Sequence, residues 1–339
     1  MGYGDGMPDH GPTPRPLADQ VAVVLGASSG IGRAAALEFA RRGTTRIVVA
    51  SRGAEALDAL AGELESMGAE AVAVPTDITD EAALQALVRV AEERFDRIDT
   101  FVTAPAVSVY GRIMDIPLED FRRVMEVNFL GHVAAAQSAV PALERAGGGV
   151  YIGVASVEGY RAFPLHAPYS ASKFALRSFQ DALRMELADA HSPVQVVSIL
   201  PASIGTPFFE HSRSRTGSMP KPPPPVYAPE LVGEAIVHAA EHPRREVPVG
   251  DAALAILAGQ RFSPALSDAL FSVAGPRQQT TNRPDDGTDI LDSPTPGPGR
   301  VRGAYADQLV TSTPLTRVTN AVPRPGELLL RARRLLPGA

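Results

Sequence analysis

A tyrosine and a lysine lie four residues apart in PYSASKFALRSF, a segment that begins at Pro168 and has the composition of a helix. Side chains at this spacing lie above one another on one helix face, so the ammonium of Lys173 can approach the phenol of Tyr169. A tyrosine ordinarily titrates near about 10, and a neighbouring cation lowers the pKa of the phenol. The pair therefore predicts a group that exchanges protons near neutral pH, although a half-buried ring beside a solvated lysine has the same spacing.

Apolar, β-branched runs alternate with longer helical patterns between residues 21 and 250. This alternation is typical of βαβ units and a parallel sheet. A run such as VQVVSIL is apolar throughout, as expected for a strand covered on both faces. We expect an α/β fold, a single doubly wound domain over residues 17–250 with a parallel sheet of about seven strands. The strands are expected at VAVVL, RIVVA, AVAVP, DTFVT, GVYIGVAS, VQVVSIL and EVPVG.

The segments outside this domain have a different composition. Residues 1–16 are rich in glycine and proline, which predicts a disordered tail. Residues 251–275 return to apolar helical spacing and predict a helical extension, in which Pro264 separates two short helices. From residue 276 to 339 the content of Pro, Gly, Thr and Asp rises, and we expect a mostly disordered tail with one terminal helix at GELLLRARRLL.

Composition excludes several classes of function. The 339 residues are 45% hydrophobic, which is enough to fill the core of a large domain, and they include no cysteine, so disulfides, thiolate metal sites and a cysteine nucleophile are excluded. The net charge of −6 disfavours nucleic acid as a partner. The sequence has no basic start followed by an apolar run and no membrane span, so we expect a cytoplasmic location.

A glycine-rich turn joins the first expected strand to the first expected helix. The segment LGASSGIG places Gly26, Gly30 and Gly32 where a chain can turn tightly and approach a ligand closely. The free NH groups at the start of a helix attract the pyrophosphate of a dinucleotide. A lone glycine trio is a weak signal, but its place after the first strand of an alternating chain favours a dinucleotide site.

The end of the second expected strand favours NADP over NAD. About twenty residues after the glycine turn, VVASR ends in Ser51 and Arg52 where NAD enzymes carry an acidic residue. An arginine there can bind the 2′-phosphate of NADP. The alternative is that Arg52 points to solvent.

Taken together, these residues resemble the short-chain dehydrogenase/reductases, a family of single-domain Rossmann enzymes that transfer hydride between NAD(P) and a carbonyl or alcohol. The resemblance covers about residues 17–250. It implies that the chain binds a small-molecule carbonyl or alcohol and forms a homodimer or homotetramer through the long helices after the fourth and fifth strands. It also implies a set of cofactor contacts, namely Gly26, Ser28, Gly30, Ile31, Gly32, Ser51, Arg52, Asp77, Ile78, Tyr169, Lys173, Pro201, Ile204 and Thr206.

The same resemblance implies the roles of four catalytic residues. Tyr169 is the general acid or base, and Lys173 lowers its pKa and binds the nicotinamide ribose. Ser156, thirteen residues before the tyrosine, donates a hydrogen bond to the reacting oxygen. Asn128 is expected to break its helix locally and to hold a water that connects Lys173 to solvent.

The proline-rich segment at residues 202–229 is too long for a simple connection and predicts a lid over the substrate. Phe208, Phe209 and His211 lie where this lid would close, and the two rings favour an apolar substrate. No further metal ligands accompany His211 at useful spacing, so we expect no metal site.

Three positions depart from the commonest pattern of the family. Leu25 replaces a threonine before the first glycine, TAPA at residues 103–106 replaces Asn-Asn-Ala-Gly, and Ala202 replaces a glycine. An apolar leucine leaves no orphaned polar group, so the first two changes compensate one another. Pro105 cannot donate a ladder hydrogen bond and should lie just beyond the strand end.

We therefore predict an NADP-dependent oxidoreductase acting on an apolar carbonyl or secondary alcohol. Two alternatives stay open: an NADP(H)-binding sensor without turnover, favoured by Leu25 and TAPA, and an interaction scaffold built on the tail. The helices at residues 251–274 have three possible roles, which are packing on the core, lining the substrate pocket, and docking on a subunit or membrane surface.

Overall fold

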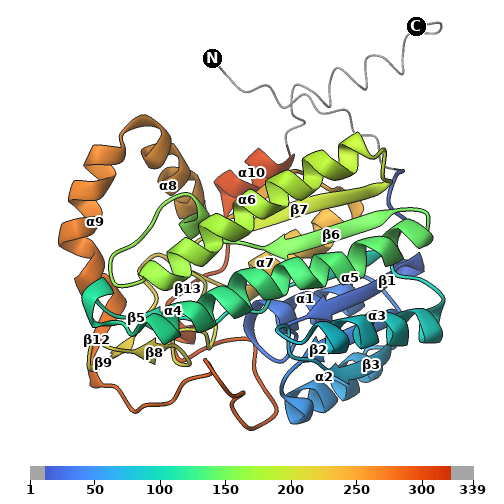
Figure 1. Ribbon diagram of the computed structural model, residues 1–339, viewed down its shortest axis with the longest axis horizontal. Helices are drawn as coiled ribbons and strands as arrows, with labels where there is room; N and C mark the ends of the chain where they lie inside the picture. Colours follow the sequence, from blue (N-terminus) through green and yellow to red (C-terminus); the bar gives the residue numbers. More distant parts are fainter. Residues whose placement is uncertain (1–11, 322–339) are drawn as a thin grey trace, which may run out of the picture.

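Seven parallel strands form the central sheet of the protein (Figure 1). The structure is a computed structural model and describes residues 12–321. The strand order is β11-β7-β6-β4-β1-β2-β3, and each neighbouring pair is parallel. The expected fold class is confirmed. The strands are β1 (Val21–Leu25), β2 (Arg46–Ser51), β3 (Glu70–Pro75), β4 (Thr100–Thr103), β6 (Gly149–Val154), β7 (Val194–Pro201) and β11 (Glu246–Val249).

Both faces of the sheet are covered, which explains the continuous apolar runs. Successive residues of a strand point to opposite faces. Val24 and Val49 accordingly belong to one core cluster, while Val23 and Val48 belong to a second cluster on the other face. All four side chains are fully buried, so each position of these strands must be apolar.

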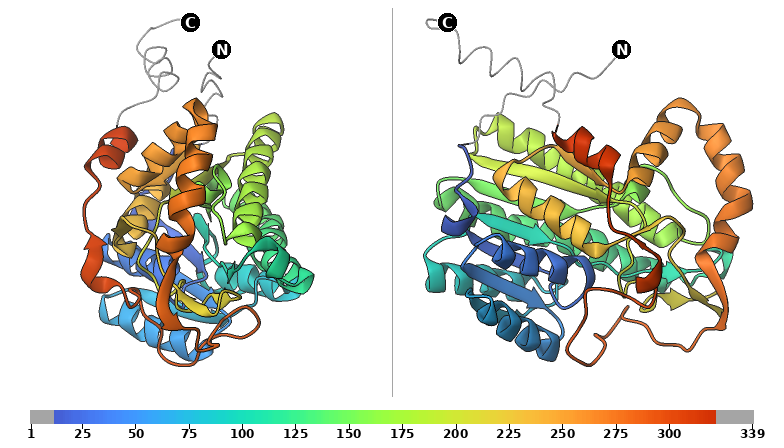
Figure 2. Two further views of the ribbon diagram at one scale, coloured as in Figure 1. Left: turned by 90° about the vertical axis from the view of Figure 1, so that its left-hand side faces the viewer. Right: turned by 180° about the vertical axis from the view of Figure 1, so that it is seen from behind.

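The helices form one layer on each face, as the two views of Figure 2 show. Helices α1 (Gly30–Arg41), α2 (Ala54–Ser66) and α7 (Pro229–Glu241) pack on the face that carries Val24. The opposite face is covered by α3 (Glu81–Phe95), α4 (Leu118–Met125), α5 (Gly131–Arg145) and α6 (Ala167–Asp189). No helix within residues 12–321 combines the length and apolar composition that crossing a membrane requires.

The strand order creates a crevice at the carboxyl ends of the strands. Strand β1 lies between β2 and β4, so the connections on its two sides run in opposite directions. In open parallel sheets a ligand binds where the strand order reverses in this way. The loops that follow β1, β2, β4, β6 and β7 meet at this crevice.

The helical extension is a hairpin of α8 (Asp251–Phe262) and α9 (Pro264–Gln279), drawn in orange at one side of Figure 1. Pro264 begins the second helix, where its missing NH and fixed φ are tolerated. The second helix continues to Gln279, four residues beyond the expected end of the extension.

Three short two-stranded sheets connect the loops to one another. They join residues of the expected lid to distant parts of the chain, so that this loop is held at several points. The pairs are β5 (Val109–Tyr110) with β8 (Arg213–Ser214), β9 (Ser218–Pro220) with β12 (Thr280–Pro284), and β10 (Val226–Tyr227) with β13 (Leu309–Val310).

Residues 276–321 differ from the expectation of a mostly disordered tail. They include β12, β13 and α10 (Pro314–Ala321), and Leu291 is buried in the core with 1% of its surface exposed. These residues lack periodicity because many of them lie in loops that bond to distant residues, as Arg300 does to Gly30 and Gly303 to Gly205. The rest of the expected tail, with its terminal helix, and most of residues 1–16 lie outside the described residues.

Candidate active site

A pocket of about 840 Å³ occupies the crevice at the carboxyl ends of the strands. It extends from the glycine turn after β1 to the helices α8 and α9. Asn128 is the one expected site residue that does not line it. The expected residues that do are Gly26, Ser28, Gly30, Ile31, Gly32, Ser51, Arg52, Asp77, Ile78, Ser156, Tyr169, Lys173, Pro201, Ile204, Thr206, Phe208, Phe209 and His211.

The turn between β1 and α1 has the shape that its three glycines predict. Gly26 and Gly30 have φ angles of 90° and 55°, in the left-handed region that favours glycine. A Cβ atom at Gly32 would overlap the carbonyl oxygen of Gly26, so the turn closes only with glycine at this position. This cradle and the start of α1 fit a pyrophosphate.

Substitution of Gly32 tests the cradle directly. We expect the dissociation constant of NADPH to rise about tenfold in Gly32→Ala, because the added methyl group displaces the backbone that approaches the pyrophosphate. Gly62→Ala is the matched control, since a Cβ at this exposed position of α2 has no atom within 4 Å. The measurement is a fluorescence titration with NADPH. Equal affinity in the two variants would contradict this assignment of the cradle.

Two buried polar atoms beside the cradle have no hydrogen-bond partner among the described residues. They are Oγ of Ser51 and Nη1 of Arg52, at the end of β2 and directly after it. The other terminal nitrogen of Arg52 donates to the carbonyl oxygen of Ile290 at 2.7 Å, which fixes the guanidinium beside the pocket. Unpartnered buried donors are uncommon in folded proteins. The pair therefore fits an anionic group of a bound dinucleotide.

Asp77 lies on the same side of the pocket, in the loop after β3. Its Oδ1 accepts hydrogen bonds from the amide of Thr79 at 2.9 Å and from the Thr79 hydroxyl at 2.8 Å. Its other oxygen is 3.9 Å from Arg123. The carboxylate is held in place by its own loop, as an adenine contact requires.

Tyr169 and Lys173 lie on one face in the first turns of α6, as their spacing predicts. The ammonium nitrogen of Lys173 is 5.5 Å from the centre of the Tyr169 ring and donates to the carbonyl oxygen of Val154 at 2.9 Å. Ser156 follows β6, and its hydroxyl is near enough to Tyr169 to lower the pKa of the phenol. The amide of Glu158 also donates to Ser156 Oγ at 3.0 Å. The tyrosine, lysine and serine are thus brought together at the pocket floor.

The predicted lowering of the Tyr169 pKa by Lys173 does not occur in this structure. Burial raises the pKa of Tyr169 above its usual range, the charge of Glu158 raises it further, and the hydrogen bond with Ser156 lowers it in part. Burial also lowers the pKa of Lys173 to about 7, against a smaller opposing effect of Glu158. Desolvation disfavours the charged form of each group, and it is the largest influence on both pKa values.

The buried lysine makes the stability of the fold depend on pH. Its pKa is about 7 in the folded protein against 10.5 ordinarily, so between these values the unfolded chain binds more protons and stability rises with pH. We therefore expect Lys173→Met to raise the melting temperature relative to wild type, by more at about pH 6.5 than at about pH 10. Thermal denaturation at both pH values measures this. Lys221→Met, which changes the other lysine of the chain, is the control, and a pH-independent difference for Lys173→Met would contradict the burial of its charge.

Asn128 lies at an interruption of the helical stretch that runs from Leu118 to Arg145. A π-helical turn, η3 (Glu126–Leu130), separates α4 from α5 and frees backbone groups for other partners. The Asn128 side chain accepts from the amide of Val107 at 2.8 Å and donates to its carbonyl oxygen at 2.9 Å. It also donates to Ser172 at 3.1 Å, next to Lys173. The expected break in the helix is confirmed, and the residue lies behind the pocket wall.

Two histidines were missing from the sequence-based set. His132 bonds to Thr103 at 3.0 Å and to the carbonyl oxygen of Pro105 at 2.9 Å, so it braces the strand end where the family's asparagines are replaced. Burial lowers its pKa to about 3, which keeps the ring neutral. The signal in the sequence is its spacing, since it lies four residues after Asn128 on the same helix face. Pro105 lies just beyond β4, as expected.

The second, His166, lies against Tyr169. Its ring stacks on Tyr169 with centres 4.5 Å apart and planes at 11°, and on Tyr110 from its other side. One ring nitrogen is 3.0 Å from Glu158, and the other bonds to Ser108. This contact chain fixes the orientation of the Tyr169 ring. Two of its bonded members, Ser108 and His166, are 58 residues apart in the sequence, so no local pattern indicates it.

The substrate end of the pocket is mainly aromatic and aliphatic. The rings of Phe208 and Tyr169 are 5.3 Å apart, and Phe209 contacts Phe208 edge to face at 5.5 Å. His211 also lines this end, and the described residues contain no group of three or more metal-binding side chains. The hairpin α8–α9 completes the wall with Ile256, Leu266, Leu270 and Phe271.

The sequence of this chain is similar to those of known oxidoreductases. A sequence model of the short chain dehydrogenase family matches residues 20–217. An uncharacterized oxidoreductase of Bacillus subtilis, YxnA, is 38% identical over 272 residues, which is 80% of this chain and 76% of that protein. Glycine betaine reductase ATRR of Emericella nidulans is 31% identical over 236 residues, which is 68% of this chain but 18% of that much longer protein.

Solved structures show the same fold. A short-chain dehydrogenase/reductase from Burkholderia phymatum, in complex with NAD, superposes with a TM-score of 0.66 at 24% identity and covers 75% of this chain and 96% of its own. An alcohol dehydrogenase from Thermococcus sibiricus, complexed with 5-hydroxy-NADP, has a TM-score of 0.59 at 24% identity, with 68% and 95% covered.

Proposed function

Because the chain belongs to the short-chain dehydrogenase family and is an oxidoreductase acting on CH-OH groups, we propose that it transfers a hydride between NADP and an apolar carbonyl or secondary alcohol. The observation that carries the proposal is the convergence of Ser156, Tyr169 and Lys173 on a pocket that also contains a glycine cradle. Each residue alone is common in structural roles. Their meeting beside a dinucleotide cradle favours catalysis.

In this proposal Tyr169 holds the proton that the substrate oxygen gains or loses. The phenol keeps this proton at neutral pH in the structure, because burial raises its pKa. Ser156 supports the same oxygen with its hydroxyl and stabilises the charge that develops in the transition state. The bound nicotinamide supplies or accepts the hydride. The stack of His166 on Tyr169 fixes the direction in which the phenol points.

Lys173 connects the tyrosine to a source of protons. Because its pKa is about 7, the group gains and loses a proton with little free-energy change at neutral pH. It binds the nicotinamide ribose and returns the proton that Tyr169 gives up. Asn128 holds the helix break beside it and provides the place for a connecting water, as the family resemblance implies.

The assignment of NADP rests on the end of β2. Arg52 and Ser51 each present a buried, unpartnered polar atom where the adenosine ribose of a dinucleotide lies in this fold. A 2′-phosphate supplies the acceptor that both donors lack. The ribose hydroxyls of NAD are uncharged, so they are weaker partners for the Arg52 guanidinium than a 2′-phosphate is.

An apolar substrate is favoured by the walls on the other side of Tyr169. Phe208 and Phe209 come from the expected lid, and Phe271 comes from α9. These side chains would bury the aliphatic or aromatic part of a substrate and exclude water from the reacting oxygen. We assign residues 17–250 as the catalytic domain and the hairpin at 251–275 as part of its substrate pocket.

The assembly is proposed from the family resemblance. We expect a homodimer or homotetramer that pairs through α5 and α6, and α6 carries the exposed side chains of Phe174 and Met185. We expect the protein to work in the cytoplasm.

A panel of apolar ketones, aldehydes and secondary alcohols, assayed with both cofactors by nicotinamide absorbance, tests the proposal. Turnover that prefers NADP(H) with at least one apolar compound supports it. Binding of NADPH without turnover of any compound would favour the sensor, and failure to bind either cofactor would overturn both.

A further inference from the structure

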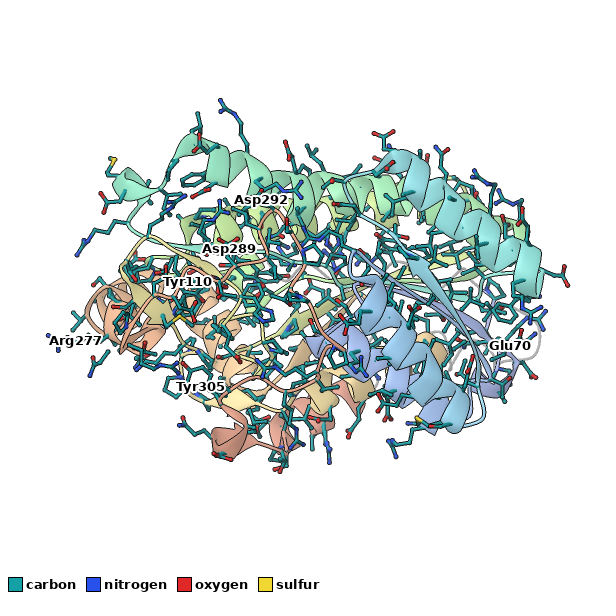
Figure 3. All side chains as sticks on the ribbon, turned by 90° about the horizontal axis from the view of Figure 1, so that it is seen from below. Glu70, Tyr110, Arg277, Asp289, Asp292 and Tyr305 are labelled. Atoms are coloured by element: carbon teal, nitrogen blue, oxygen red, sulfur yellow. The ribbon has the colours of Figure 1, made fainter. Side chains whose placement is uncertain are left out.

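Residues 289–304, here called the strap, cross the mouth of the dinucleotide crevice. The strap lies outside residues 20–217, which match the family model. In Figure 3, Asp289 and Asp292 lie far from Glu70, which marks the amino end of β3, so the strap begins on the carboxyl side of the sheet. Ile290 and the residues from Pro294 to Arg300 line the same pocket as the cradle.

The first end of the strap is fixed by charge and burial. Arg213 of the lid pairs with Asp289 at 2.8 Å and with Asp292 at 2.8 Å. The amide of Ile290 donates to the carbonyl oxygen of His211 at 3.1 Å, and the next residue, Leu291, is buried. This end is therefore joined to the loop expected to cover the substrate.

The middle of the strap lies directly on the cofactor cradle. The carbonyl oxygen of Arg300 accepts from the amide of Gly30 at 3.0 Å. Arg33, in the first turn of α1, donates to the carbonyl oxygen of Pro298 at 3.0 Å. Gly299 has a φ of 72°, and a Cβ there would overlap the carbonyl oxygen of Ser28. Glycine is required here because the two backbones touch.

The second end returns to the nicotinamide side. The amide of Gly303 donates to the carbonyl oxygen of Gly205 at 3.0 Å, and Ala304 bonds to Glu210. Arg302 pairs with Glu230 at 2.8 Å. The strap thus contacts the adenosine end through Arg52 and Ile290, the pyrophosphate cradle through Arg300, and the nicotinamide loop through Gly303.

We propose that the strap forms the outer wall of the dinucleotide site and retains bound NADP(H). The cofactor then leaves only when the strap moves away from the cradle. This inference rests on the proposed function. The pocket of about 840 Å³ is lined by residues of both the strap and the cradle, so space for a ligand remains beside their contact, which favours enclosure of a ligand over blockage of the site. The alternative is that the strap is a plug, meaning that it blocks the site: the carbonyl oxygen of Arg300 occupies the amide of Gly30, and the cofactor must displace the strap in order to bind.

The variant Gly299→Ala separates the two because it pushes the strap off the cradle. If the strap encloses the cofactor, NADPH dissociation becomes at least tenfold faster in this variant. The measurement is stopped-flow fluorescence of the loaded protein, chased with excess NADP⁺. Gly287→Ala is the matched control, since Gly287 has a similar φ of 76° but a Cβ there meets no atom within 4 Å. Its dissociation rate is expected to equal that of wild type.

Two results would overturn the enclosure. Faster association with unchanged dissociation in Gly299→Ala would indicate a plug, and wild-type rates for both steps would mean that the strap has no part in cofactor exchange. Hydrogen exchange on the wild-type protein gives an independent readout. Added NADPH protects residues 293–301 if the strap encloses it and exposes them if the strap is a plug. In another outcome, the wild-type protein binds NADPH and catalyses turnover of a substrate, while Gly299→Ala leaves dissociation unchanged and NADPH leaves hydrogen exchange at residues 293–301 unchanged. That result would refute the proposed role of the strap but would leave the proposed function intact.

Discussion

The variant Tyr169→Phe is expected to lose about 10³-fold in turnover number while binding NADPH as tightly as wild type. General acid–base catalysis by a positioned side chain contributes about 10²–10⁴-fold, and this substitution removes the proton-bearing atom alone. The ring keeps its stacking on His166, and Ser156 keeps its bond from the amide of Glu158. Steady-state kinetics with a compound from the carbonyl panel, together with a fluorescence titration, measure the two quantities.

Tyr160→Phe is the control for this experiment. Its hydroxyl donates to Glu246 at 2.6 Å, and burial raises the pKa of Tyr160 to about 12, so it is also a perturbed tyrosine on the same side of the sheet. It does not line the pocket, and its variant is expected to turn over at nearly the wild-type rate. Equal turnover numbers for the two variants would remove Tyr169 from the mechanism.

The features that the sequence predicts well are those that depend on neighbouring residues. The alternating runs predict the strands because both faces of the sheet are covered, as Val23 and Val24 show in adjacent positions. The glycine turn is predicted because Gly26 adopts a backbone conformation that other residues rarely adopt. The spacing of Tyr169 and Lys173 predicts one helix face, and the structure places both at the pocket.

Features that depend on distant contacts were not predictable. The pKa of Lys173 falls because the whole fold buries its ammonium, and no local spacing shows that burial. The sequence predicts disorder for the strap because the hydrogen bonds that hold it join residues far apart in the chain, such as Gly30 and Arg300. Its glycines and prolines permit an extended path across the cradle, but the composition of a flexible tail is the same.

The variant Arg52→Gln is expected to raise the dissociation constant of NADPH about 100-fold and to change that of NADH by less than about threefold. Hydrogen bonds to a charged group contribute about 1.5–3 kcal/mol each, so the loss of the guanidinium opposite a 2′-phosphate accounts for about 2.7 kcal/mol. Burial lowers the pKa of Arg52, but an arginine stays charged at neutral pH. Fluorescence titrations with both cofactors measure the change in preference.

Because Arg52 also contacts the strap, the result to compare is the ratio of the NADPH and NADH dissociation constants, rather than either constant alone. Arg52 also donates to the carbonyl oxygen of Ile290, so its replacement removes one of the several bonds that hold the strap and weakens the binding of both dinucleotides by the same small factor. A loss specific to NADPH therefore reports the phosphate, whereas an equal loss for both cofactors would show that Arg52 acts only by holding the strap. Arg46→Gln, at the opposite end of β2 where Arg46 donates to the carbonyl oxygen of Asp19 at 2.6 Å, is expected to change neither affinity. An unchanged NADPH affinity in Arg52→Gln would contradict the proposal that Arg52 binds the 2′-phosphate of NADP.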